Sequence, residues 1–334
     1  MNKNKYKIVY TDCEYDEIEI EKNVLKELDC EIVMLQTIEE DKLIEGCKDA
    51  DALMIIVAPI TSRVIKELKK CKVISRAGVG VDTIDVEAAS NAGILVCNVP
   101  DCNSNEVSDH AIALIMCLGR KIINFYQSVK NGNWDIPAKG KKLIFDFKKL
   151  TLGLVGFGKI GRNIYEKMKL IFQNIIVCDP FLSVEIKNKY KVNLKSFDEL
   201  LRESDFISIL CPLNKNNFHL FDYREFRLMK KTSYIINTSR GSIINSKALY
   251  DALVNKQIAG AGLDVLEEEP PDFEFKLSKL DNVIITPHAA YYSKSSLECT
   301  KYNFALNVLK VLKNEEPINV VNQELLIDKK INKI

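Results

Sequence analysis

Short apolar runs alternate with charged segments of helical period along most of this 334-residue chain, and this alternation constrains the fold more than any other feature. Five runs near the N-terminus are typical of short buried strands: Lys7–Tyr10, Glu31–Leu35, Ala52–Val57, Lys72–Ser75 and Gly93–Cys97. The segments Ile20–Leu28 and Val64–Lys69 lie between such runs. Strands that are apolar on both faces and joined by helices predict a parallel sheet. We therefore expect a first α/β unit over about residues 1–100.

A second alternation of the same kind begins at Leu150. Its expected strands are Leu152–Val155, Asn174–Asp179, Phe206–Leu210, Tyr234–Asn237, Ile258–Asp264 and Asn282–Thr286. Lys159–Leu170 has helical period, and Ser196 with Glu199 forms the sequence signature of a capping box. A second parallel α/β unit is expected here, followed by an amphipathic helix over Leu297–Lys313.

The two alternations are separated by a turn and a long apolar helix. Turn residues fill Asn98–Asn103, and Asn103 with Glu106 resembles another capping box. The apolar residues that follow recur at helical spacing on a broad face, which predicts a buried helix: Val107, Ala111, Leu114, Ile115 and Leu118. Residues 120–150 are irregular, and a stretch of this length is expected to be functional or interfacial.

Length and charge restrict the class of protein. A chain of 334 residues corresponds to about two domains. The 47 basic and 46 acidic residues leave a net charge of +1, which argues against binding to nucleic acid. No apolar run approaches the roughly 18 residues of a membrane helix, and the N-terminus lacks the apolar core of a signal peptide. We expect a cytoplasmic protein that binds neither membrane nor nucleic acid.

The ten cysteines are not spaced like a disulfide framework or a metal site. They include no Cys-x-x-Cys pair, and most lie within expected strands or helices. We expect reduced thiols that pack as small apolar side chains. With three histidines in the chain, we also expect no metal site.

A glycine motif follows one expected strand and opens a helix: Gly156, Phe157, Gly158, Lys159, Ile160 and Gly161. Gly156 permits a tight turn, Gly158 lets the backbone approach a pyrophosphate, and Gly161 lets the helix pack on the sheet. The phosphates would meet free N–H groups at the helix N-terminus. This context predicts a dinucleotide site.

An acid at the end of the next strand refines the identity of the dinucleotide. Asp179 lies 18 residues beyond Gly161. Its carboxylate would accept hydrogen bonds from the adenine ribose hydroxyls and repel a 2′-phosphate. The motif therefore predicts NAD rather than NADP as the cofactor.

Hydride transfer to or from a nicotinamide requires a cation for the substrate and an acid/base group. Arg240 follows one expected strand and is suited to bind the carboxylate of a 2-oxo acid and to polarise its ketone. His288 follows another expected strand and is suited to transfer a proton. A carboxylate should orient His288, and spacing leaves Glu267, Glu268 and Glu269 equivalent, with Pro270 slightly favouring Glu269. The remaining histidines, His110 and His219, are expected to be structural.

The motifs at these positions occur in a characteristic order: Ser75–Asp85, Asn98–Pro100, Glu106–Ala111, Gly156–Gly161, Leu210–Leu213, Asn237–Gly241, Leu263–Val265, Glu269–Pro270 and Thr286–His288. Over nearly its full length the chain resembles the D-isomer-specific 2-hydroxyacid dehydrogenases. That family includes D-3-phosphoglycerate, D-lactate, formate and glyoxylate/hydroxypyruvate dehydrogenases.

The resemblance implies roles that spacing leaves open. It assigns catalysis to Arg240, Glu269 and His288, with His288 as the acid/base paired to Glu269. It assigns the remaining residues to the cofactor or substrate: Cys211, Pro212 and Thr238 to the cofactor wall, Asp264 to the nicotinamide carboxamide, the Val79 and Gly80 N–H groups to the substrate carboxylate, and Tyr291 to the substrate.

The resemblance also implies the domain layout. A Rossmann NAD-binding domain over residues 102–290 is inserted into a flavodoxin-like substrate domain formed by residues 1–101 and 291–334. Both are doubly wound parallel-sheet α/β domains. Residues of about 120–150 would form the arm of a homodimer. The active site would lie in the cleft between the domains, which would close during turnover.

Two segments bear on the substrate. His288–Ser293 most resembles a subgroup related to the C-terminal-binding protein corepressors, in which the residue matching Tyr291 is often Trp. Ala58–Thr61 lacks the basic residue that phosphoglycerate enzymes use nearby, and Glu269 argues against a formate dehydrogenase, which would carry Gln. We predict NAD-dependent interconversion of a small 2-oxo acid and its D-2-hydroxy acid. The alternative is an NAD(H)-responsive, corepressor-like binding protein with little turnover.

Overall fold

The computed structural model describes residues 5–13, 15, 17–134, 146–272 and 275–325. The chain divides into two compact units, Met1–Asn103 with Ser293–Ile334, and Ser104–Tyr292. The sequence places these crossings at 101/102 and 290/291, two residues earlier in each case. The second unit is therefore an insertion within the first.

The first unit is built on a five-stranded sheet with strand order β2-β1-β3-β4-β5, and all of its strand pairs are parallel. The strands are β1 (Tyr6–Tyr10), β2 (Cys30–Met34), β3 (Ala52–Ile55), β4 (Val73–Arg76) and β5 (Leu95–Cys97). The helices are α1 (Glu19–Leu25), α2 (Glu40–Cys47), α3 (Ser62–Glu67), α4 (Val86–Asn91) and α12 (Lys294–Leu312). The expected doubly wound fold of this unit is confirmed.

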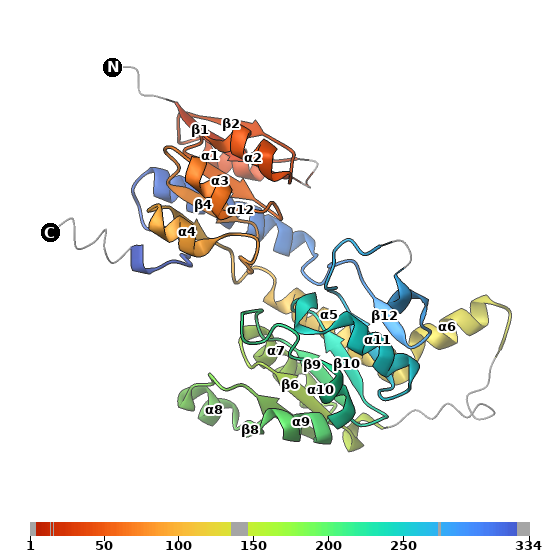
Figure 1. Ribbon diagram of the computed structural model, residues 1–334. Coiled ribbons are helices and arrows are strands. Elements are labelled where there is room, and N and C mark those ends of the chain that lie inside the picture. Colours follow the sequence, from red (N-terminus) through yellow and green to blue (C-terminus); the bar gives the residue numbers. More distant parts are fainter. Residues whose placement is uncertain (1–4, 14, 16, 135–145, 273–274, 326–334) are drawn as a thin grey trace. The chain divides into compact units, whose positions relative to one another are not determined.

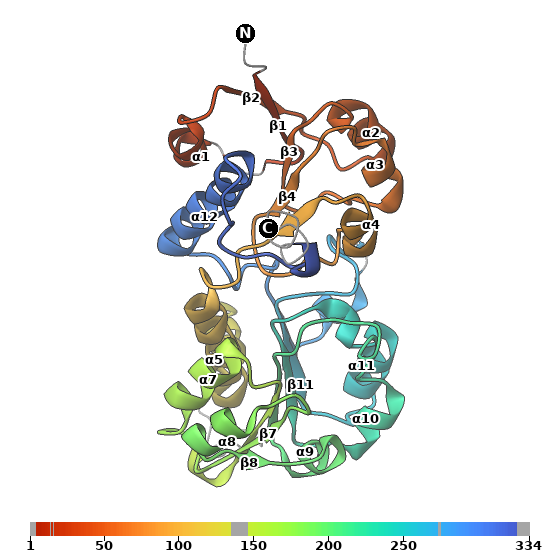
Figure 2. The same cartoon turned by 90° about the vertical axis from the view of Figure 1, so that its left-hand side faces the viewer.

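Both faces of this sheet are covered, which explains its continuous apolar strands. Helices α1 and α12 lie on one face and α2, α3 and α4 on the other (Figure 2). Successive residues of β1 alternate between the two cores, so that Ile8 and Tyr10 pack with α12 whereas Val9 packs on the opposite side. The rings of Tyr10 and Phe304 contact edge to face at 5.5 Å. The C-terminal segment thus completes the core of the N-terminal sheet.

The second unit is built on a seven-stranded parallel sheet with strand order β12-β11-β10-β9-β6-β7-β8. Strands β6, β8, β9, β10 and β12 of this sheet are labelled in Figure 1. Its strands are β6 (Thr151–Val155), β7 (Asn174–Cys178), β8 (Asn193–Leu194), β9 (Phe206–Ile209), β10 (Tyr234–Asn237), β11 (Gly260–Leu263) and β12 (Val283–Ile285). Its helices are α5 (Ser104–Arg120), α6 (Ile122–Lys130), α7 (Lys159–Met168), α8 (Val184–Tyr190), α9 (Phe197–Glu203), α10 (Tyr223–Leu228) and α11 (Ser246–Val254), with short 3-10 turns at Phe147–Lys149, Gly241–Ile243 and Lys276–Lys279.

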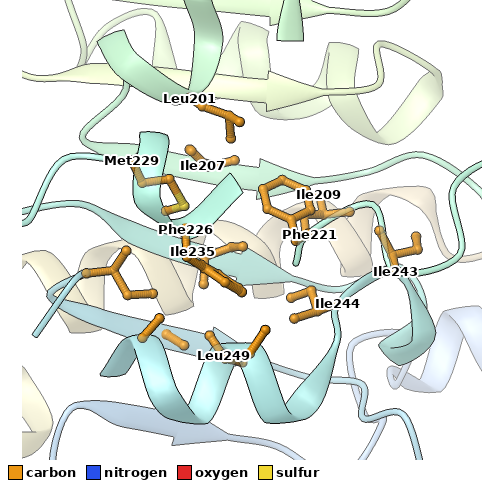
Figure 3. Packing of buried hydrophobic residues seen from close by; sticks show 14 of the residues in the cluster. Leu201, Ile207, Ile209, Phe221, Phe226, Met229, Ile235, Ile243, Ile244 and Leu249 are labelled. Carbon is orange, nitrogen blue, oxygen red and sulfur yellow. The ribbon is translucent and has the colours of Figure 1, made fainter. Parts of the chain in front are cut away.

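Two apolar cores hold this sheet between its helices. On one face, Leu201 of α9, Phe226 of α10 and Leu249 of α11 pack over Ile207 and Ile235 of the central strands (Figure 3). On the other face, helices α5 and α7 cover a core that includes Leu152, Phe172 and Phe206. The strand order reverses between β6 and β9, and ligands of open parallel sheets bind at such a switch point, beyond the carboxyl ends of the strands.

Of the local predictions, one capping box is confirmed, another is wrong, and the stretch 120–150 differs from expectation. The capping box of Ser196 and Glu199 is confirmed at the start of α9. The one expected at Asn103 is wrong, because the Asn103 Oδ1 atom is buried without a hydrogen-bond partner. The stretch 120–150 is less irregular than expected, since it contains α6 and a 3-10 turn at Phe147–Lys149. Residues 135–145 of the expected dimer arm lie outside the described residues.

The prediction of ten reduced core thiols is wrong for one pair, because the structure joins Cys102 and Cys299 in a disulfide. These residues are 197 positions apart in sequence, with Cα atoms 5.6 Å apart, so local spacing gives no sign of their proximity. Of the free cysteines, Cys47 and Cys97 are fully buried and the others are partly exposed. No helix among the described residues is long and apolar enough to cross a membrane.

Candidate active site

The glycine motif forms the turn between β6 and α7, at the switch point of the second sheet. Gly156 has a φ of +100°, and a Cβ atom there would lie 2.9 Å from the backbone nitrogen of Cys211. A Cβ atom at Gly161 would lie 2.7 Å from the Gly156 carbonyl oxygen. Around Gly158, the N-cap of α7, a Cβ atom would meet nothing within 4 Å. The first and third glycines therefore permit close packing, and the second faces open space at the helix N-terminus.

Asp179 follows β7 and bonds to the glycine turn itself. Its Oδ2 atom accepts a hydrogen bond from the Phe157 N–H at 2.8 Å, and its Oδ1 atom accepts one from the Phe181 N–H at 2.9 Å. The sequence predicts a ribose contact for this carboxylate and gives no sign of the Phe157 bond. Asp179 thus fixes the shape of the turn at the same place where it would meet an adenosine.

The residues that follow β9 and β10, which are Cys211, Pro212 and Thr238, are suited to line the site of the remaining part of a dinucleotide. The Thr238 hydroxyl is buried and has no hydrogen-bond partner, so it is available to a bound polar group. Burial raises the pKa of the Cys211 thiol to about 11, which keeps it neutral at physiological pH. Pro212 follows, and its carbonyl accepts a hydrogen bond from Asn217. A neutral wall, an unpaired hydroxyl and an open helix start fit an NAD molecule.

Glu269 and His288 form a close pair on neighbouring loops. The Glu269 Oε2 atom lies 2.6 Å from the His288 Nδ1 atom, and Oε1 accepts a hydrogen bond from the Leu266 N–H at 2.7 Å. Burial raises the pKa of Glu269, but the hydrogen bonds from His288 and Leu266 and the charges of His288 and Arg240 outweigh it, so the pKa lies below its ordinary value. Glu269 is therefore a charged partner that orients the ring.

A second histidine–glutamate pair distinguishes Glu267 from its neighbours Glu268 and Glu269. The Glu267 Oε1 atom lies 2.5 Å from the His219 Nε2 atom, and Oε2 accepts a hydrogen bond from the Ser246 N–H. Glu268 is exposed. Of the three carboxylates that spacing leaves equivalent, the structure places Glu269 beside His288 and Glu267 beside a different histidine.

Arg240 follows β10 and lies beside the glutamate loop. Its Nη1 atom donates to the Ser239 carbonyl at 2.8 Å, and its charge contributes to the lowered pKa of Glu269. A Cβ atom at Gly241 would lie 1.8 Å from the carbonyl carbon of Leu266, so glycine alone permits this approach. The arginine turn and the glutamate loop are thus packed backbone against backbone. A glycine directly after the arginine is the sequence signal for this contact.

Asp264 is 1% exposed, and its carboxylate holds the turn that carries His288. It accepts hydrogen bonds from the Thr286 hydroxyl at 2.5 Å and from the Ala289 and Ala290 N–H groups at 2.9 Å each. The His288 N–H donates to the Asp264 carbonyl at 2.8 Å. Sequence reasoning missed this role, and the predicted contact with nicotinamide stays a prediction.

The remaining predicted residues come from three other parts of the chain. His110 of α5, expected to be structural, has its Nε2 atom 2.9 Å from the Thr286 hydroxyl. Tyr291 lies near His288, with ring centroids 6.5 Å apart. Val79 and Gly80 belong to the turn after β4 in the first unit. No cluster of side chains suited to a metal ion occurs in the described part of the chain.

Comparison with known proteins identifies the family. Residues 112–290 match the model of the D-isomer specific 2-hydroxyacid dehydrogenase NAD binding domain. The chain is 38% identical over 306 residues to D-3-phosphoglycerate dehydrogenase of Methanocaldococcus jannaschii, covering 91% of this chain and 58% of that protein. It is 35% identical over 286 residues to glyoxylate reductase of Korarchaeum cryptofilum, covering 85% of this chain and 86% of that one. The chain belongs to the D-isomer specific 2-hydroxyacid dehydrogenase family.

Solved structures of the family support the fold. D-Lactate dehydrogenase of Aquifex aeolicus, solved with NAD and lactic acid, superposes with a TM-score of 0.85 and 28% identity, covering 94% of this chain and 98% of that one. A glyoxylate reductase of Paecilomyes thermophila gives a TM-score of 0.86 and 27% identity, covering 96% and 99%. The second unit is accordingly an NAD-binding domain, and the class is that of NAD-dependent oxidoreductases acting on 2-hydroxy acids. The relatives named here are enzymes and give no support to a corepressor.

Removing the charge of Asp179 should reduce the preference for NADH. We expect Asp179→Asn to weaken NADH binding about tenfold and to narrow its advantage over NADPH, because the repulsion of a 2′-phosphate is lost. Titration of both cofactors, followed by the fluorescence of the dihydronicotinamide, measures the two dissociation constants. Glu185→Gln, which removes a carboxylate from α8, serves as the control. An unchanged ratio of the two constants in Asp179→Asn would refute the assignment.

Proposed function

We propose that this protein interconverts a small 2-oxo acid and the corresponding D-2-hydroxy acid with NAD(H). The observation that carries the proposal is the Glu269–His288 pair with the charge of Arg240 beside it, on loops that follow parallel strands of the NAD-binding unit. An acid/base group and a cation are the two elements that reduction of a carbonyl requires from the protein.

The proposal gives Arg240, His288 and Glu269 different roles. Arg240 binds the substrate carboxylate and polarises the ketone through charge-assisted hydrogen bonds. The Nδ1 atom of His288 faces Glu269, so the other ring nitrogen gives a proton to the developing alkoxide and accepts it in the reverse direction. Bound NADH supplies the hydride. Glu269 keeps the ring oriented and stabilises its charged form.

For the first unit, we propose that the Val79 and Gly80 N–H groups bind the substrate carboxylate. The residues of the loop after β3 favour a substrate with a small, uncharged side chain. Val57 is 45% exposed there, and Ala58–Thr61 contains no basic residue to bind a phosphate. We therefore place glyoxylate, pyruvate and hydroxypyruvate before phosphorylated substrates, with Tyr291 contacting the substrate.

A panel of 2-oxo acids tests the activity. NADH oxidation is followed with glyoxylate, pyruvate, hydroxypyruvate, longer oxo acids and 3-phosphohydroxypyruvate. We expect turnover with one or more of the small acids and a loss of about 10²–10⁴-fold in kcat for His288→Ala, with NADH affinity kept. Absence of turnover with the whole panel, together with NAD-dependent capture of a protein partner, would favour the corepressor-like alternative.

Glu269 gives a pH-dependent test. Because its pKa is lowered, the carboxylate is charged above the ordinary value of about 4.3, and its contribution is lost only as the pH falls through the lowered value. Without this charge, the His288 ring loses the partner that orients it. We expect Glu269→Gln to lower kcat for reduction roughly 10–100-fold and to remove the fall in kcat that the unaltered protein shows as the pH drops through the lowered pKa of Glu269.

The neighbouring Glu268 offers a matched control for that variant, because it is exposed and one residue away. Glu268→Gln should keep the pH profile and kcat of the unaltered protein. If both variants behave alike, the role assigned to Glu269 is wrong.

We also propose that the protein is a homodimer whose interface includes α6. This helix exposes a row of apolar side chains, which a second copy would cover: Ile122, Ile123, Tyr126 and Val129 are between 42% and 56% exposed. We expect the double variant Ile122→Glu/Val129→Glu to convert a dimer into a monomer in light-scattering chromatography. Val254→Glu, at an exposed position of α11, is the control. A monomeric unaltered protein would overturn the proposal.

A further inference from the structure

The turn that carries Val79 and Gly80 is held from behind by the two residues Asn98 and Val99, which follow β5. The Val99 N–H donates to the Gly78 carbonyl at 2.7 Å. The Asn98 Nδ2 atom donates to the Val79 carbonyl at 2.6 Å. Two consecutive carbonyl groups of the turn are therefore bound by one adjacent segment.

Because the peptide bond is planar, these contacts determine the direction in which two N–H groups point. In a trans peptide the C=O and N–H bonds point in opposite directions. The Gly78 carbonyl shares its peptide with the Val79 N–H, and the Val79 carbonyl shares its peptide with the Gly80 N–H. Because both carbonyls face the 98–99 segment, both N–H groups face away from it. Successive N–H groups that converge on one side form an anion-binding concavity.

Glycine is required where this turn begins. Gly78 has a φ of +140°, a conformation that other residues rarely adopt. Gly78 is buried, whereas Val79 is 41% exposed. Asn98 and Val99, which bind the two carbonyls, are both buried, so the carbonyls lie toward the interior of the unit. The N–H groups on the opposite side of the same two peptides therefore lie toward the exposed side of the turn.

Asn98 is itself fixed by two further asparagines from the C-terminal segment. The Asn307 side chain, which is fully buried in α12, donates to the Asn98 carbonyl at 3.3 Å and accepts from the Ile318 N–H at 2.9 Å. The Asn319 side-chain nitrogen donates to the Asn98 Oδ1 atom. Since that oxygen is engaged with a donor, the Asn98 nitrogen is the atom that faces Val79.

We propose that Asn98 is a positioning residue for the substrate carboxylate. By binding the Val79 carbonyl it aims the Gly80 N–H, and it polarises that peptide so that the N–H is a stronger donor. This inference rests on the proposed function in one respect, which is that the Val79 and Gly80 N–H groups bind the carboxylate. Asn98 acts through this peptide, so its effect is confined to binding of the oxo acid.

The kinetic signature follows from where the carboxylate acts. It is bound equally in the ground state and in the transition state, so a weaker contact raises KM and leaves kcat nearly unchanged. We expect Asn98→Ala to raise KM for the best oxo acid about ten- to hundredfold, with KM for NADH unchanged. Asn319→Ala frees only the Asn98 oxygen and should raise KM about threefold.

Asn322 provides the matched control. It is 2% exposed, and its side chain accepts from the Val96 N–H and donates to the Ile94 carbonyl, so it supports β5 without contacting the turn. Asn322→Ala should lower the melting temperature, because two buried hydrogen bonds to β5 and its neighbouring residue are lost, and should leave KM for the oxo acid unchanged. A rise in KM of equal size in Asn322→Ala, or no rise in folded Asn98→Ala and Asn319→Ala, would overturn the inference.

A binding measurement separates this inference from the proposed activity. Oxamate, a non-reducible analogue of a 2-oxo acid, is titrated calorimetrically into the NADH complex of each variant. If the unaltered protein binds oxamate without turning over any oxo acid, the proposed activity fails, while weaker oxamate binding by Asn98→Ala supports the positioning role. If the unaltered protein neither turns over oxo acids nor binds oxamate, both proposals are overturned.

Discussion

The hydrogen bonds to the buried carboxylate of Asp264 are the interaction on which the proposed catalytic arrangement depends. A charge that is removed from water must be compensated by hydrogen bonds, and the compensation here comes from the turn after β12. That requirement brings the ends of two adjacent strands together and fixes the backbone of His288, which lies in the left-handed region with a φ of +51°. His288, the proposed acid/base group, therefore takes its position from the cost of leaving an aspartate unpaired.

The same principle recurs at each end of the site. Asp179 bonds to the glycine turn, Glu267 bonds to His219, and Glu269 bonds to His288. Each of these three carboxylates lies on one loop and bonds to a group on another loop. Loops that follow parallel strands are not ordered by the sheet itself, so these contacts supply the order that the proposed hydride and proton transfer need.

The sequence predicts the parts of this structure that depend on local pattern. Apolar runs such as Ala52–Ile55 are buried on both faces and therefore indicate parallel strands, and the glycine spacing indicates the dinucleotide turn. It does not predict contacts between distant segments. Spacing leaves three glutamates equivalent, and the His219 pairing that distinguishes Glu267 depends on how two loops pack. The disulfide of Cys102 and the unpartnered Asn103 oxygen likewise depend on tertiary proximity, which no local pattern encodes.

The return of the C-terminal segment to the first unit has a consequence for folding during synthesis. The inserted unit has all of its residues by position 292, whereas the face of the first sheet that α1 and α12 cover together lacks α12 until Lys294–Leu312 has left the ribosome. Tyr10 and its apolar neighbours must wait for Phe304 and Val308 to bury them. Domains usually fold in the order of synthesis. Here the order is reversed: the segment made first is the last to acquire a complete core.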